Sequence, residues 1–178
     1  MTTIVAIETS DGVTIGADSK VTDSSGAMWI HPEAKKITSV GKYLIAGSGE
    51  VAALDIAHHL WTPPVPNTKD KKDIYHFFIS KVMPSLKQTM KENDYKIIPD
   101  KDEDERFNLL IAIEGRIFEV SDDFSVVMRE DGIYGIGSGS DLARGALYAG
   151  ATIEQALTIA STHDIYTAPP FLIITQEK

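Results

Sequence analysis

The residue with the clearest potential for chemistry is Thr2, which directly follows Met1. A threonine hydroxyl is a weak nucleophile until a base takes its proton, and one solution uses the residue's own free α-amine as that base. This solution requires a threonine at the mature N-terminus. Because a small second residue permits removal of Met1, processing would expose both the hydroxyl and the amine of Thr2.

Two other motifs are weaker candidates. Gly135 and Gly137 precede an expected helix, but Ser140 stands where a dinucleotide-binding fingerprint needs its third glycine, and the βαβ unit is also missing. The pair His58 and His59 points to different faces of an expected helix and lacks the spacing of a zinc-binding helix. We interpret the pair as a partly solvated surface feature and predict no catalytic metal.

Composition narrows the class of protein. The 178 residues fit a single domain over 1–178, and the absence of cysteine excludes disulfides and thiolate chemistry. The net charge of −9 disfavours nucleic acid and anionic membranes as partners. There is no apolar run of about 20 residues and no secretory signal, so we expect a cytoplasmic protein without a membrane span.

The apolar pattern alternates between strand and helix periods. Period-two segments predict strands at 3–9, 13–17, 36–40, 43–46, 108–114, 116–120, 124–129 and 171–175. Helical spacing predicts four helices, marked by Ala53, Ile56, Ala57 and Leu60, by Ile74, Phe77, Phe78 and Val82, by Leu142, Ala146 and Leu147, and by Ile153, Ala156, Leu157 and Ala160. Pro84 should kink or end the second helix, and the charged stretch 101–106 should be a solvated loop.

This order of elements predicts the fold class. Strands that form antiparallel pairs are grouped apart from paired helices along the chain. We therefore expect an α+β protein, a four-layer αββα sandwich of two antiparallel sheets flanked by helices.

Several separated segments resemble HslV peptidases and proteasome β subunits, which are N-terminal nucleophile (Ntn) hydrolases. At the start of the chain these are residues 2–7 (TTIVAI), 13–18 (VTIGAD) and 34–37 (AKKI). Further on they are residues 45–47 (IAG), 137–140 (GSGS) and 164–167 (DIYT). Their order and spacing both match the family.

The resemblance implies a role for each matching residue. Thr2 would be the nucleophile, Lys36 the lysine that favours a neutral α-amine, with Lys35 as a lesser candidate, and Asp18 the carboxylate that orients it. The Gly47 amide would face the developing oxyanion. Further roles, to position the amine from behind, fall on Ser138, Asp164 and Thr167.

The resemblance also implies where substrate binds. The substrate-binding strand would comprise Ile45, Ala46, Gly47, Ser48 and Gly49, with Ile45 on the floor of the pocket for the residue before the cleaved bond. An apolar floor predicts a weak preference for apolar side chains. The segment after Gly47 is shorter than in the family, so Glu50 is a rival feature that could swing into the pocket.

The implied function is that of a threonine-type endopeptidase in a homo-oligomeric double ring, supplied with unfolded protein by an AAA+ unfoldase. Two alternatives stay open. One is a stand-alone amidohydrolase of the same fold, and the other is a silent structural ring subunit that retains Met1. No cofactor is implied, apart from a structural monovalent or divalent cation held by backbone carbonyls near Asp164 and Thr167.

Overall fold

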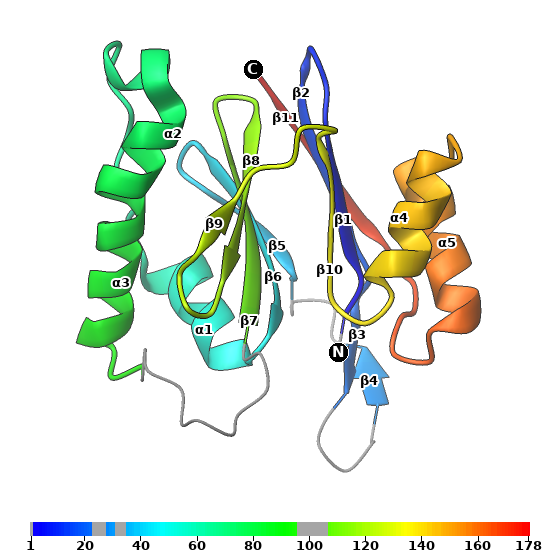
Figure 1. Cartoon of the computed structure of the whole chain (residues 1–178). Coiled ribbons are helices and arrows are strands. Elements are labelled where there is room, and N and C mark those ends of the chain that lie inside the picture. Colours follow the sequence, from blue (N-terminus) through cyan, green and yellow to red (C-terminus); the bar gives the residue numbers. More distant parts are fainter. Residues whose placement is uncertain (1, 23–27, 31–34, 96–106) are drawn as a thin grey trace.

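Two antiparallel sheets lie face to face between two layers of helices in the computed structural model (Figure 1). The structure describes residues 2–22, 28–30, 35–95 and 107–178. The α+β class and the four-layer αββα arrangement are confirmed. The expected loop at 101–106 lies outside the described residues.

The first sheet contains the N-terminal hairpin. Its strand order is β10 (Ile133–Ile136), β1 (Ile4–Glu8), β2 (Gly12–Ala17) and β11 (Leu172–Glu177). Ile4 and Ala6 point into the core between the sheets, whereas Val5 points to the helices on the outer face. Successive side chains of β1 therefore point to opposite faces of the sheet, and both faces are covered.

The second sheet runs in chain order through β5 (Ile37–Val40), β6 (Tyr43–Gly49), β7 (Phe107–Ile113), β8 (Arg116–Ser121) and β9 (Val126–Val127). Leu44 and Ala46 face the first sheet, while Tyr43 and Ile45 face the helices. A separate pair, β3 (Lys20–Thr22) and β4 (Met28–Ile30), extends beyond the sandwich. Neither this pair nor β10 was expected from the apolar pattern.

The helices over the second sheet are less regular than predicted. They are α1 (Val51–Asp55) with a π-helical turn at Ile56–Leu60, a 3₁₀ turn at Asp70–Asp73, α2 (Ile74–Phe77), a π-helical turn at Phe78–Val82, and α3 (Met83–Glu92). Pro84 does not end the helix, because α3 continues for eight residues beyond it, and the predicted kink stays a prediction. The π turn just before Pro84 widens the backbone where proline lacks its N–H donor.

Two helices cover the outer face of the first sheet, α4 (Ser140–Tyr148) and α5 (Ile153–His163). Thr152 begins α5 with a capping box, in which its side chain and that of Gln155 each accept a backbone N–H. Among the predicted apolar markers, Leu60 and Leu142 are exposed rather than buried. No helix of the described residues is long and apolar enough to cross a membrane.

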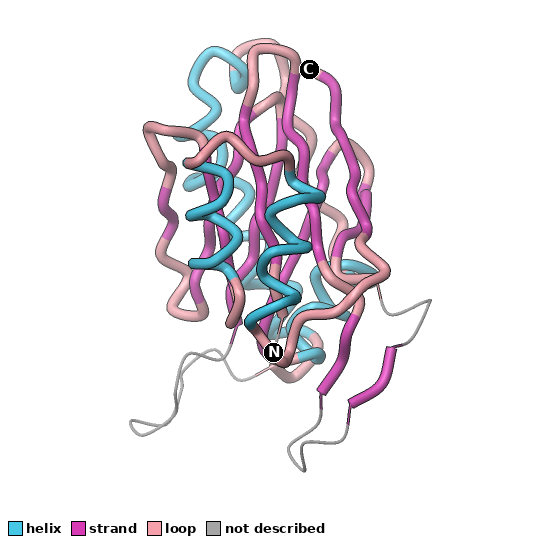
Figure 2. Tube along the Cα trace, turned by 90° about the vertical axis from the view of Figure 1, so that its right-hand side faces the viewer, coloured by secondary structure: helices cyan, strands magenta, loops and turns pink. Residues whose placement is uncertain are grey.

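The N-terminal segment lies at one end of the sandwich, below the start of β1. In Figures 1 and 2 this end also holds β3 and the segment leading into α4, while the C-terminus lies at the opposite end. Segments that are far apart in the sequence therefore lie at the same end of the sandwich.

Candidate active site

Asp18 is the hub of the polar cluster beside Thr2. It follows the last residue of β2, and only 1% of its surface is exposed. Its Oδ1 accepts the Thr3 amide at 2.9 Å and the Lys36 ammonium at 2.7 Å. Its Oδ2 accepts the amides of Lys20 at 3.0 Å and Ala168 at 3.3 Å. These bonds fix the carboxylate in one orientation.

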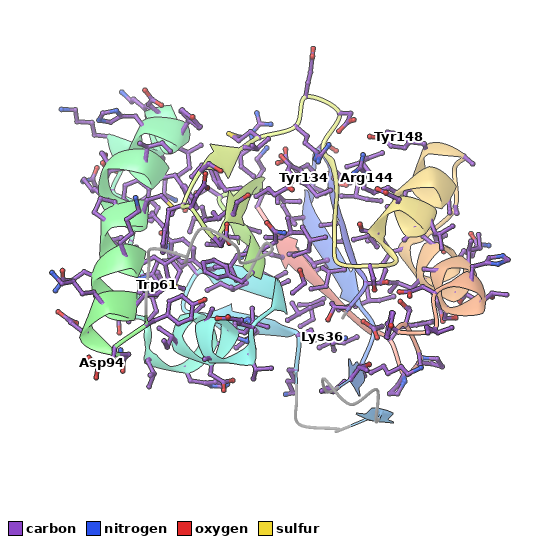
Figure 3. The ribbon with its side chains drawn as sticks, turned by 60° about the horizontal axis from the view of Figure 1, so that its bottom comes forward. Lys36, Trp61, Asp94, Tyr134, Arg144 and Tyr148 are labelled. Atoms are coloured by element: carbon purple, nitrogen blue, oxygen red, sulfur yellow. The ribbon has the colours of Figure 1, made fainter. Side chains whose placement is uncertain are left out.

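Lys36 precedes β5 and is buried, whereas its neighbour Lys35 is exposed. Burial lowers the pKa of Lys36, although the Asp18 and Asp164 carboxylates act in the opposite direction. Figure 3 shows Lys36 between the two halves of the molecule. The structure thus pairs Lys36, and not Lys35, with Asp18.

Ser138, Asp164 and Thr167 form a second cluster on the other side of the N-terminal segment. The Asp164 Oδ2 atom accepts the Ser138 hydroxyl at 2.8 Å and the Thr167 hydroxyl at 2.6 Å. Burial alone would raise the pKa of Asp164, but these two hydrogen bonds, a third from the Tyr166 amide and the charge of Lys20 together lower the pKa. The Ser138 hydroxyl also lies 3.4 Å from the Thr2 carbonyl oxygen, and the Thr167 hydroxyl lies 2.5 Å from that of Thr3.

The glycines around Ser138 allow this segment to approach the N-terminus closely. A Cβ atom on Gly137 would lie 2.1 Å from the Thr2 carbonyl oxygen, and Gly137 has a φ of +89°. A Cβ atom on Gly139 would lie 2.1 Å from the Thr3 hydroxyl. A side chain at Gly137 would therefore displace Thr2, and one at Gly139 would displace Thr3.

On the sequence prediction that Thr2 is the nucleophile of a peptidase, the Gly137→Ala variant should lose at least roughly tenfold in kcat/KM on a peptide substrate, because small displacements of reacting groups are costly. The Gly145→Ala variant is the matched control, since its added methyl meets nothing within 4 Å on helix α4. Peptide hydrolysis and thermal melting should be measured for both variants. Equal activity of the two would show that the close approach of Gly137 does not position Thr2.

The Gly47 amide does not have the orientation that its predicted role requires. It donates a hydrogen bond to the Lys36 carbonyl at 3.2 Å, so it is not aimed at an oxyanion. A Cβ atom here would lie 2.0 Å from Leu54 and 2.8 Å from Leu109. The requirement for glycine therefore comes from the packing of β6 against helix α1.

The rest of the predicted substrate strand divides between core and site. Ile45 and Ala46 are fully buried, Ile45 in the core under the helices and Ala46 in the core between the sheets. Ile45 is not among the residues that line the two cavities at Thr2, and its role as the pocket floor stays a prediction. Ser48 and Gly49 do border Thr2. Glu50 accepts the Tyr95 hydroxyl at 2.6 Å and does not enter these cavities.

Two cavities meet at Thr2. The first, of about 120 Å³, lies toward helix α1 and is lined in part by Lys36, Val51, Leu54 and His58. The second, of about 440 Å³, lies toward helix α4. Its wall is more polar and includes Glu119, Arg129, Ser138 and Arg144. Thr2 and Gly49 line both cavities, so a chain bound across Thr2 would have space on each side.

His58 was missed as a site residue by the sequence analysis. It is 6% exposed, whereas His59 is on the surface, so the interpretation of the pair as a partly solvated feature is wrong for His58. Its position seven residues after Val51 and four after Leu54 places it on their face of the helix, which is the signal that could have found it. Burial lowers its pKa to about 4, and proximity to His59 acts in the same direction.

No group of three or more His, Asp or Glu side chains suited to a metal ion occurs in the described part of the chain. The cation suggested near Asp164 and Thr167 would use backbone carbonyls and stays a prediction. The arrangement around Thr2 does offer a buried lysine, a fixed carboxylate and two hydroxyl groups. Such groups can shift the pKa of a neighbouring N-terminal amine and can orient an N-terminal nucleophile.

No protein-family model matches the chain, and neither does any curated protein. Solved structures do match over nearly the whole length. A structure titled as Thiobacillus denitrificans BPH in complex with epoxomicin has a TM-score of 0.74 at 19% identity, covering 98% of each chain. HslV from Trypanosoma brucei has a TM-score of 0.69 at 20% identity, covering 99% of each chain.

A third kind of structure is also similar. An Anbu (Gly-1) mutant from Hyphomicrobium sp. strain MC1 has a TM-score of 0.67 at 15% identity, covering 99% of this chain and 82% of that chain. Identities this low show the fold alone. The chain has the proteasome-type fold of the Ntn hydrolases, as HslV does.

Proposed function

We propose that the chain is an N-terminal threonine peptidase, with Thr2 as its nucleophile after removal of Met1. The observation that carries the proposal is the buried ion pair of Asp18 and Lys36. This pair is tied to the N-terminal segment through the Thr3 amide, and Lys36 lines a cavity together with Thr2. A buried ion pair is weak evidence for stability alone, so a functional role is the better account.

The reaction would proceed through an acyl-enzyme. The Thr2 hydroxyl oxygen attacks the scissile carbonyl carbon while the α-amine takes the hydroxyl proton, and the resulting ammonium returns that proton to the leaving amine. The same amine then removes a proton from water, whose oxygen attacks the ester carbonyl carbon, and the amine passes that proton to the Thr2 oxygen as the acid product leaves. The oxyanion would form beside Ser48 and Gly49, the part of β6 that borders Thr2.

The surrounding charges suit an amine as the base. A free α-amine has a pKa of about 7.7–8.0, and a neighbouring Lys36 ammonium would favour its neutral form. Asp18 keeps that ammonium in place. Ser138 would hold the Thr2 carbonyl and Thr167 the Thr3 hydroxyl, while Asp164 orients the hydroxyl groups of Ser138 and Thr167.

We also propose that the chain forms a homo-oligomeric ring. An AAA+ unfoldase would be its partner and would supply unfolded protein as the substrate. The fold shared with HslV supports it. Exposed apolar side chains on helices α4 and α5, Leu142, Tyr148 and Ile159, are the kind that subunit contacts cover.

Blocking the N-terminus tests the proposal and separates it from a silent ring subunit. A chain with a lysine inserted between Met1 and Thr2 should retain its methionine, because a bulky second residue prevents removal. Intact mass would verify the N-terminus of both chains, and fluorogenic peptides would report activity. Hydrolysis is expected only from the chain that begins with Thr2, and equal hydrolysis by the blocked chain would refute the proposed mechanism. Cleavage of small amides but not of peptides would favour a stand-alone amidohydrolase.

A further inference from the structure

The larger of the two cavities at Thr2 has an uncompensated positive charge in its wall. Its volume is about 440 Å³, and the charged side chains among the described residues that line it are Arg129, Arg144 and Glu119. The Arg129 Nε atom donates a hydrogen bond to Glu119 at 3.2 Å, so these two opposite charges balance each other. Arg144 therefore has no carboxylate partner within this lining.

The fold holds the Arg144 side chain against the cavity wall. Arg144 belongs to helix α4 and Gly135 to strand β10, and both residues line the cavity. A Cβ atom on Gly135 would lie 2.6 Å from the Cδ atom of Arg144 and 2.7 Å from its Cγ atom. Glycine at this position thus makes room for the aliphatic part of the arginine, which lies over the strand and ends in the guanidinium.

The Arg144 guanidinium has unused hydrogen-bond donors. None of its three nitrogens makes a hydrogen bond within the part of the chain that the structure describes. The Nε atom is closed off from solvent, whereas the two terminal nitrogens are accessible, and the side chain is 24% exposed. A largely buried cation is favourable only when acceptors complete its hydrogen bonds. The two terminal nitrogens are the atoms that a bound anion could reach.

Two carboxylates outside this lining lie near Arg144 without a hydrogen bond to it. The Asp141 Oδ1 atom is 3.7 Å from the Arg144 Nη1 atom, and 94% of the Asp141 side chain is exposed, so water weakens this contact. The oxygens of Asp131 instead accept the Tyr148 hydroxyl at 2.6 Å and the Ile133 amide at 3.0 Å. The positive charge at the cavity is therefore not cancelled from behind.

We propose that this cavity binds a carboxylate of the substrate, on an acidic side chain close to the cleaved bond, through the terminal nitrogens of Arg144. A guanidinium presents parallel N–H groups that match the two oxygens of a carboxylate. Thr2 lines the same cavity, so a side chain bound there belongs to a residue near the bond that Thr2 attacks. The inference rests on the proposed peptidase function and adds a substrate class to it, peptides with Asp or Glu near the cleaved bond.

The test uses quenched fluorescent peptides without other charges, in which one Gln is replaced by Glu at successive positions before and after the cleaved bond. Glu and Gln have the same shape and differ in charge. The net charge of −9 repels an added carboxylate at long range, so a faster Glu peptide requires a local contact. On the side of the bond that faces this cavity, kcat/KM should be at least roughly fivefold higher for Glu than for Gln. No gain at any position, or an equal gain on both sides of the bond, would overturn the proposal.

Variants of Arg144 assign the gain to its guanidinium. Arg144→Gln keeps the Cγ and Cδ atoms over Gly135 and removes the charge, so the Glu-to-Gln ratio should fall to near one. Arg144→Lys keeps the charge without the parallel N–H groups and should retain part of the ratio. The matched control is Arg116→Gln, which removes the same charge where Arg116 pairs with Glu8 at the far end of β1, and its ratio should stay unchanged. An unchanged ratio in Arg144→Gln, or an equal loss in Arg116→Gln, would reject the role of Arg144.

Binding measurements keep the site testable if no peptide is cleaved. Calorimetry with the Thr2→Ala chain, which lacks the nucleophile, should show tighter binding of the Glu peptide than of its Gln counterpart. This order without cleavage by the wild type would contradict the peptidase function and support the carboxylate site. Cleavage by the wild type without a Glu preference would support the function and overturn the site.

Discussion

Thr2→Ala should lower kcat/KM for peptide hydrolysis by roughly a thousandfold or more, because the variant has no nucleophile and the rest of the site cannot replace it. The free energy of unfolding should change by about 1 kcal/mol or less, since the change removes one hydroxyl and leaves no large cavity. Activity should be compared after mass spectrometry has confirmed that Met1 is absent from each chain.

Thr2→Ser is the matched control for this variant. Serine keeps a hydroxyl and an α-amine at the same position, so this chain should retain measurable hydrolysis. Both variants should assemble as the wild type does. Wild-type rates from Thr2→Ala, above those of a mock purification, would mean that another residue attacks the substrate.

Lys36→Ala is expected to cause a loss almost as large as that of Thr2→Ala. The ammonium that would keep the α-amine neutral disappears, and Asp18 loses its partner at 2.7 Å. Breaking a buried pair typically costs about 3–5 kcal/mol of stability, although here three backbone amides still bond to Asp18. Melting temperatures must therefore accompany the rate measurements.

Lys35→Ala separates a local from a general effect of charge. Lys35 directly precedes Lys36 and has the same side chain, but it is exposed. Its loss should therefore change the rate of peptide hydrolysis by about threefold or less. The double variant Thr2→Ala, Lys36→Ala should lose little more than Thr2→Ala alone, because residues that act as a unit are not additive. A severe Lys35→Ala phenotype beside a mild Lys36→Ala phenotype would exchange the roles of the two lysines.

Regular local patterns made much of the fold predictable. The turn before Gly12 and the alternation in β1 and β2 predict the N-terminal hairpin, and helical spacing predicts α5. The short strand β10 has only four residues and includes a glycine, and its pairing with β1 bridges more than a hundred residues of sequence. Such a strand exists because β1 offers it an edge, which its own sequence does not reveal.

The site was predictable where a residue's neighbours in space follow from strand register. Ile4 opposes Ala17 across the hairpin, so Thr3 and Asp18 necessarily meet at its end. Gly47 and His58 were misread because their surroundings come from helix α1. The sequence does not show that Leu54 packs on Gly47, or that the helix buries His58 beside Ile45 while it leaves His59 exposed.

The most direct test of the central claim is covalent trapping of Thr2 by a peptide epoxyketone, followed by tandem mass spectrometry of the N-terminal peptide. Such a probe has two electrophilic carbons, and a residue with adjacent hydroxyl and amine groups can bond to both. We expect a single adduct on Thr2 that involves both groups, present in the chain without Met1 and absent from Thr2→Ala. An adduct on any other residue, or equal labelling of Thr2→Ala, would contradict the assignment of Thr2 as the nucleophile.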